Sequence, residues 1–116
     1  YRKIKPYQTI NEHYRTKGNI FYLCKQFEAL GNKIVVVTHH APTFKSCEDS
    51  FRGQASNVYY ASDLSEEILD RKIDVWIHGH THSSCEYNVG ETLVLCNPFG
   101  YNGSNVKFDR NKHIVL

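Results

Sequence analysis

The first third of the chain carries two patterns of apolar residues. Within residues 11–30 the apolar positions recur at steps of three and four, and Gly31 stands where helices commonly end. Residues 34–37 then form a short β-branched run between turn residues, which is typical of a strand buried on both faces. These patterns predict a helix over 11–30 and a buried strand over 34–37.

The middle of the chain begins with a segment that has no clear period. Residues 41–61 therefore predict a long irregular loop, a type of loop that often carries function. Residues 62–70 favour a second helix, with Ser62 or Asp63 as its N-terminal cap. Residues 73–77 favour a second buried strand.

The C-terminal part changes to the pattern of β-hairpins. Residues 84–97 predict a strand, a tight turn at Val89-Gly90 and a second strand, and residues 105–116 predict another pair with its turn at 109–112. The order of these elements indicates the α/β class, with a mixed β-sheet and flanking helices. Because no repeat or linker interrupts the chain, we expect a single domain.

Composition excludes only a few classes of protein. The 116 residues carry a formal net charge of +2, too small to favour nucleic acid or a membrane surface as a partner. No apolar stretch approaches the roughly 20 residues that cross a bilayer. The four cysteines form no C-x-x-C pair and predict free thiols in a reducing, cytoplasmic setting, while their even number leaves a disulfide open. The first residue is not methionine, so we expect a longer protein around this chain.

Five of the seven histidines stand in two short windows at the ends of the predicted strands. One window is residues 39–40 and the other is residues 78–82. Ligand sites of α/β sheets collect outside the carboxyl ends of the strands, so we expect the two windows to converge on one site. His13 and His113 belong to neither window and are interpreted as surface residues.

Imidazole chemistry favours a metal ion at such a site. Neutral imidazole is the commonest protein ligand for ions of the Zn, Fe, Mn and Ni type. In an extended backbone His80 and His82 point the same way, although a bend at the glycine before them would break this alternation. We predict His39, His80 and His82 as metal ligands. His78 is interpreted as a support, and His40 as either a support or a contact to substrate.

Three stretches of this sequence resemble one enzyme family. "VVVTHHAP", "DVWIHGHTH" with its G-H-x-H signature, and "ETLVLCNPFGY" resemble the C-terminal half of the calcineurin-like metallophosphoesterases over about residues 34–101. The resemblance implies the C-terminal half of a two-layered αββα sandwich, with mixed β-sheets and flanking helices. It also implies that residues 1–116 are the C-terminal part of one such domain, whose N-terminal half is absent from this chain.

The resemblance also implies a chemistry. Metallophosphoesterases use two divalent cations, such as Mn, Fe, Zn or Ni, to clamp phosphate oxygens and to lower the pKa of a bridging water. His39 and His80 match ligands of the second ion, and His82 matches a ligand of the first. The implied activity is hydrolysis of phosphomonoesters or phosphodiesters, with a small phosphoester as substrate and His40 beside it.

The earlier motifs of that family are missing from this chain. No D-x-H precedes His39, no Gly-Asp pair occurs, and the Gly-Asn pairs at Gly18 and Gly31 lack the following histidine. The bridging carboxylate is therefore missing, and the histidine that serves as catalytic acid is expected in the N-terminal half. Because two close cations repel without compensating negative charge, we predict that this chain alone binds at most one metal ion, weakly, and is inactive.

Two other functions stay open from the sequence. The chain could belong to a non-catalytic relative that uses the fold as a binding module, or to a transition-metal binding protein without phosphate chemistry. Upstream D-x-H, G-D and G-N-H motifs would favour the enzyme. In the long loop, Arg52 is a candidate phosphate contact. Candidate substrate contacts besides His40 are Thr43, Phe44, Tyr59, Tyr60 and Asn97, with the tyrosines interpreted first as ordinary core or surface aromatics. The absence of a basic stripe disfavours extended nucleic acid.

Overall fold

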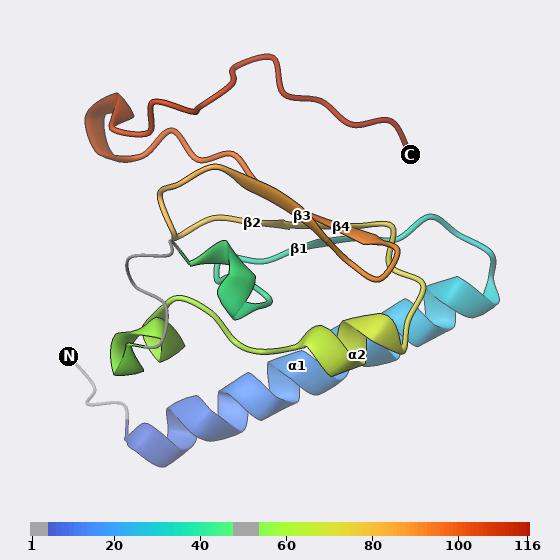
Figure 1. Ribbon diagram of the computed structural model, residues 1–116. Coiled ribbons are helices and arrows are strands. Elements are labelled where there is room, and N and C mark those ends of the chain that lie inside the picture. The colour runs from blue at the N-terminus through green and yellow to red at the C-terminus, as the bar shows by residue number, and fades with distance from the viewer. Residues whose placement is uncertain (1–4, 48–53) are drawn as a thin grey trace.

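The computed structural model describes residues 5–47 and 54–116, so Arg52 lies outside the described residues. Two helices lie along one side of a four-stranded sheet, and the C-terminal segment passes on the other side (Figure 1). This arrangement confirms the predicted α/β class. The helices are α1 (Pro6–Ala29) and α2 (Ser65–Leu69), and the strands are β1 (Val35–Val37), β2 (Val75–His78), β3 (Cys85–Val89) and β4 (Thr92–Cys96).

The sheet is mixed, as the sequence predicted. Its strand order is β1-β2-β4-β3, with β1 parallel to β2, β2 parallel to β4, and β3 antiparallel to β4. The three parallel strands share one direction, so their carboxyl ends lie along the same edge of the sheet. That edge carries the residues that follow Val37, His78 and Cys96.

The core lies between the sheet and the two helices. Trp76 and Val94 from the sheet and Ile68 from α2 are each 0% exposed. β2 is buried as predicted, but the prediction for β1 is wrong on one face. β1 is an edge strand, so Val35 and Val37 remain 39% and 70% exposed while Val36 between them enters the core.

Local sequence signals fix both ends of α1. The helix begins at Pro6, five residues before the predicted start, because proline suits the first turn and the Gln8 side chain accepts the Lys5 N–H at 2.9 Å. At the other end Gly31 has a φ of 71°. The N–H groups of Gly31 and Asn32 donate to the carbonyls of Glu28 and Phe27, at 3.0 and 3.2 Å. This pattern closes the last turn and confirms the predicted role of Gly31.

The second helix is shorter than predicted and begins at Ser65. The Ser62 N–H donates to the Ala41 carbonyl at 3.0 Å, and the Leu64 N–H donates to the Pro42 carbonyl at 2.9 Å. These bonds hold residues 62–64 against the preceding loop and keep them out of the helix. Within the described part of that loop, two short 3₁₀ turns form at Phe44–Ser46 and Ala55–Tyr59.

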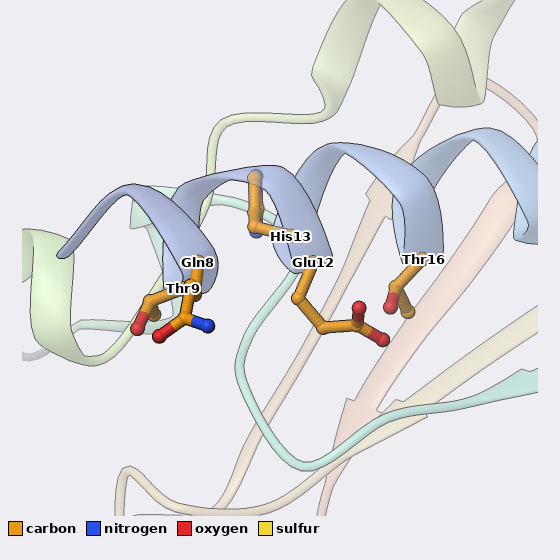
Figure 2. A pocket seen from close by; sticks show the side chains of 5 residues that line it. All are labelled: Gln8, Thr9, Glu12, His13 and Thr16. Atoms are coloured by element: carbon orange, nitrogen blue, oxygen red, sulfur yellow. The ribbon is translucent and has the colours of Figure 1, made fainter. Parts of the chain in front are cut away.

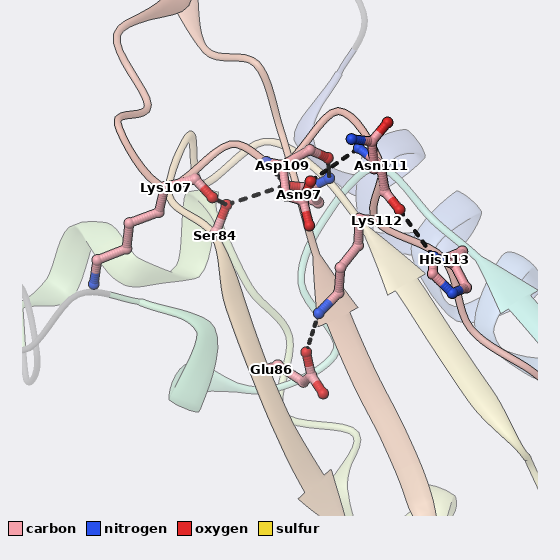
Figure 3. A network of polar contacts seen from close by, with 8 residues as sticks. All are labelled: Ser84, Glu86, Asn97, Lys107, Asp109, Asn111, Lys112 and His113. Carbon is pink, nitrogen blue, oxygen red and sulfur yellow. Dashed lines mark hydrogen bonds and ion pairs between the residues drawn. The ribbon is translucent and has the colours of Figure 1, made fainter.

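The predicted C-terminal hairpin is wrong, because no strand forms within residues 105–116. The Asn97 side chain takes the place of a strand partner (Figure 3). Its amide nitrogen donates to the Asp109 carbonyl at 2.7 Å, and its oxygen accepts the Asp109 N–H at 3.0 Å. An ion pair between Lys112 and Glu86 ties the same segment to β3. Side-chain amides compete with strand ladders in this way.

Asp74 links the start of β1 to the start of β2. Its carboxylate accepts hydrogen bonds from the Ile34 N–H at 2.8 Å and from the Lys33 ammonium at 3.0 Å. These two bonds, with the one from Ile34 contributing most, hold the pKa of Asp74 below its ordinary value. Folding therefore favours the ionised form of this carboxyl.

We expect Asp74→Ala to lower the free energy of unfolding by about 1–2 kcal/mol at pH 7, because the Ile34 N–H loses a charged acceptor. A depressed pKa stabilises the fold above the unfolded pKa of the carboxyl, and this contribution is lost as pH falls through the folded pKa. Urea unfolding at pH 7 and at acid pH should therefore show the variant and the wild type converging in acid. An equal difference at both pH values would contradict this role for the charge. Lys33→Ala is the matched control and should cost less, because exposed ion pairs contribute little.

Candidate functional site

The two histidine windows meet at the carboxyl ends of β1 and β2. The Thr38 N–H donates to the Ile77 carbonyl at 3.0 Å, which extends the strand pairing by one residue. The Gly79 N–H then donates to the His39 carbonyl at 3.1 Å. These two backbone bonds hold the segments that follow β1 and β2 side by side. The predicted convergence of the two windows is therefore confirmed.

Three imidazole rings form a compact cluster at this point. The ring centroid of His80 lies 4.7 Å from that of His39 and 4.7 Å from that of His40. The centroids of His39 and His40 are 5.2 Å apart. Tyr60 of the long loop packs beside His80, with ring centroids 5.1 Å apart and ring planes tilted by 32°. Two of the predicted metal ligands, His39 and His80, are therefore neighbours.

The third predicted ligand, His82, has a different neighbour. Its ring packs edge-on against Tyr101, with centroids 4.4 Å apart. Among the described residues, no ring contact joins His82 to the cluster of His39, His40 and His80. No pattern in the sequence predicts that Tyr101 lies beside His82, because the position of the short 3₁₀ turn that contains it (Tyr101–Gly103) depends on the tertiary fold.

The backbone of the histidine turn, residues 79–82, is not extended. β2 ends at His78, and both His80 and His82 have left-handed backbones, with φ values of 65° and 56°. Of the two arrangements that the sequence left open, the chain therefore adopts the bent one, and the alternation that would align the two rings does not hold. Left-handed residues other than glycine cost about 1–3 kcal/mol each and cluster at functional sites.

A chain of hydrogen bonds connects the buried core to the second histidine of the first window. The Trp76 indole N–H donates to the Thr38 hydroxyl oxygen at 2.9 Å. That hydroxyl in turn donates to the His40 carbonyl at 2.7 Å. Trp76 is fully buried, so this chain anchors the loop that carries His39 and His40.

Electrostatics at the cluster favour a neutral His40. Partial burial lowers the pKa of His40, and the neighbouring imidazoles of His80 and His39 lower it further. A hydrogen bond with the Tyr59 backbone opposes these effects. A lowered pKa keeps the imidazole unprotonated at neutral pH, the state in which its ring can accept a hydrogen bond.

His78 lies beneath the histidine turn and is 4% exposed. Its Nε2 is 2.8 Å from the Ser46 hydroxyl, which is 2.7 Å from the Tyr87 hydroxyl. The Thr43 hydroxyl is also 2.7 Å from that of Tyr87. The His78 side chain therefore belongs to a hydrogen-bonded network with the hydroxyl groups of Ser46, Tyr87 and Thr43.

A cleft of about 340 Å³ lies beside the cluster, between α1 and the end of β1. His13, interpreted from the sequence as a surface residue, lines this cleft together with His39 and His40. The helical pattern could not show which face of α1 meets the loop after β1. His13 and Thr16 also border a more open hollow along the first half of α1, whose other lining residues are Gln8, Thr9 and Glu12 (Figure 2).

The cleft contains no acidic group among the residues that the structure describes. Its lining beyond the three histidines consists of Thr16, Lys17, Ile20, Val37, Thr38, Ala41, Pro42, Ser62, Leu64 and Trp76. Lys17 forms an ion pair with Glu67 of α2. The cleft therefore offers imidazole and hydroxyl groups but no carboxylate that could bridge two cations.

The donor set fits only part of a metal centre. Within residues 5–47 and 54–116, no group of three or more His, Cys, Asp or Glu side chains is arranged to hold a metal ion. His39 and His80 could contribute two imidazole nitrogens to one ion, and further ligands would have to come from elsewhere. Metal binding by His39, His80 and His82 stays a prediction.

No helix within the described residues is long and apolar enough to cross a membrane.

Comparison with known proteins leaves the family of this chain open. No family model matches the chain, and no solved structure matches it. The chain is similar to an uncharacterized protein of Acanthamoeba polyphaga mimivirus, with 25% identity over 105 residues. This alignment covers 84% of the chain and 37% of the viral protein, so the chain spans little more than a third of that relative.

Proposed function

We propose that this chain supplies the C-terminal half of the active site of a metal-dependent phosphoesterase. Such an enzyme would hydrolyse small phosphomonoesters or phosphodiesters. The observation that supports this proposal is the cluster of His39, His40 and His80 at the carboxyl ends of two parallel strands. The left-handed backbone of His80 adds to it, because such strain at a polar residue is typical of functional sites.

Each histidine has a distinct part in the proposed site. His39 and His80 would hold one divalent cation, and His82 would contribute to the site of a second. Bound cations would polarise the phosphoryl oxygens and provide a hydroxide nucleophile. His40 lies beside His39 and lines the cleft, where its neutral ring can hydrogen-bond to an oxygen of the phosphoester. The remaining ligands, including a bridging carboxylate, would come from an N-terminal half.

The proposal predicts different activities for this chain alone and for the native protein, which is proposed to include an N-terminal half. We expect residues 1–116 alone to hydrolyse p-nitrophenyl phosphate and bis(p-nitrophenyl) phosphate at the background rate with added Mn²⁺, because the described lining of the cleft includes no carboxylate that could balance a second cation. The native protein should hydrolyse at least one of them in the presence of Mn²⁺, and a chelator should abolish the turnover.

Two results would contradict this proposal. Metal binding without turnover by the native protein would favour a binding module or a metal-binding protein. Robust turnover by residues 1–116 alone would show that the missing carboxylate is not required. His113→Asn is a suitable control in both proteins, because His113 lies on the exposed C-terminal segment.

A further inference from the structure

Two cysteines stand opposite each other in the sheet, next to the histidine turn. Cys85 of β3 and Cys96 of β4 are Cα partners in the antiparallel register, and both are free thiols. Opposite residues project from the same face of a sheet, with Cα atoms about 4.5–5.5 Å apart. A disulfide spans Cα distances of about 4.4–6.8 Å, so this register suits an S–S bond.

The two cysteines differ in their surroundings and therefore in their reactivity. Cys85 is partly exposed, and its Sγ lies 3.7 Å from Nε2 of the buried His78. Hydrogen bonds from Cys96, then His78 and Ser46, hold the pKa of the Cys85 thiol well below its usual range. Cys96 is 1% exposed, and its hydrogen bond with Cys85 and its burial raise its pKa. Thiolate character and access make Cys85 the sulfur that reacts first.

We propose that Cys85 and Cys96 form a reversible thiol–disulfide pair that is oxidised by peroxides and acts on the histidine turn. The Cys85 sulfur attacks one peroxide oxygen, the O–O bond breaks, and the leaving hydroxide takes the proton that the Cys85 thiol gives up and becomes water. The Cys96 sulfur then attacks the resulting sulfenic acid at Cys85, forming the S–S bond and breaking the S–O bond. The departing hydroxide takes the Cys96 proton, so two thiols and one hydrogen peroxide give one disulfide and two waters.

The link to the histidine turn runs through the Cys96 thiol. Its sulfur lies 3.9 Å from the Gly79 carbonyl oxygen and 3.6 Å from the Thr81 hydroxyl. Gly79 and Thr81 flank His80. A disulfide has no S–H to donate, so oxidation removes the contact to Gly79 and changes the packing beneath His80.

The test is to oxidise the 116-residue chain with hydrogen peroxide, alkylate the remaining thiols and digest without reduction. A protease that cleaves after glutamate cuts at Glu86 and Glu91, so the Cys85 and Cys96 peptides stay together only if a disulfide joins them. We expect this linked pair as the main oxidised product, and its separation by dithiothreitol. Cys24→Ala is the matched control, because Cys24 is buried in α1, and should give the same product.

Other outcomes overturn the proposal. Free Cys85 and Cys96 after peroxide treatment, or a dominant disulfide from Cys85 to Cys47, would exclude the pair. These results come from the wild-type chain and do not depend on whether a variant folds. Amide resonances of Gly79, His80 and Thr81 should shift on oxidation while those of α1 stay in place. A disulfide that leaves the turn resonances unchanged would exclude the action on the histidine turn.

Discussion

Trp76→Ala is expected to lower the free energy of unfolding by about 3–5 kcal/mol, the usual cost of truncating a fully buried aromatic side chain. Trp76 is 0% exposed and lies in the sheet register between Val36 and Val94. Its ring centroid lies 6.0 Å from that of Phe21, so it also connects the sheet to α1. Domains of this size have a total stability of about 5–15 kcal/mol, so the variant should be close to unfolding. Urea unfolding followed by circular dichroism measures this loss.

Trp76→Phe separates packing from hydrogen bonding. Phenylalanine keeps much of the buried ring but cannot donate to the Thr38 hydroxyl, which holds the His40 carbonyl. We expect a smaller loss of about 1–2 kcal/mol, together with a change in the ring resonances of His40. A loss below about 1 kcal/mol for Trp76→Ala would contradict its central place in the core.

Local signals in the sequence predicted the elements that local physics decides. Gly31 was identified as a helix end because only a residue tolerant of positive φ suits that position, and its φ is 71°. A tight turn joins β3 and β4 as predicted, but it lies at Gly90-Glu91, one residue later than expected, because Val89 still pairs with Thr92. Gly90 has a positive φ of 57°. The convergence of the histidine windows followed from a rule of topology, since parallel strands end at one edge of a sheet.

The wrong predictions concern segments whose conformation is decided by contacts with residues far away in the sequence. The repeat of apolar and polar residues in 105–116 favours a hairpin, but the Asn97 side chain pairs with the backbone of Asp109 instead. The φ values of His80 and His82 depend on the contacts of a turn that the alternation of residues cannot reveal. His13 is exposed, as predicted for a surface residue, but its place beside the cleft depends on how α1 is rotated against the loop after β1.

His80→Asn is expected to weaken Ni²⁺ binding by residues 1–116 by about 100-fold or more. Changes to groups that only orient metal ligands already cost about 10- to 100-fold in affinity, and this change removes a proposed ligand itself. Ni²⁺ is the suitable probe because it binds imidazole strongly. Asparagine is the suitable replacement because it tolerates a left-handed backbone, and His80 has a φ of 65°. Isothermal titration calorimetry at neutral pH measures both affinities.

Two further histidines make this measurement specific to the cluster. His82→Asn should reduce the affinity less than His80→Asn, because the His82 ring packs against Tyr101 rather than against His39. His113→Asn should leave it unchanged, since His113 is exposed at the far end of the chain. Equal affinities for the wild type and His80→Asn would show that the rings of His39, His40 and His80 pack together for structural reasons alone. The proposed metal centre would then lose its main support, while the redox pair at Cys85 and Cys96 would remain untouched, because it depends on the strand register instead.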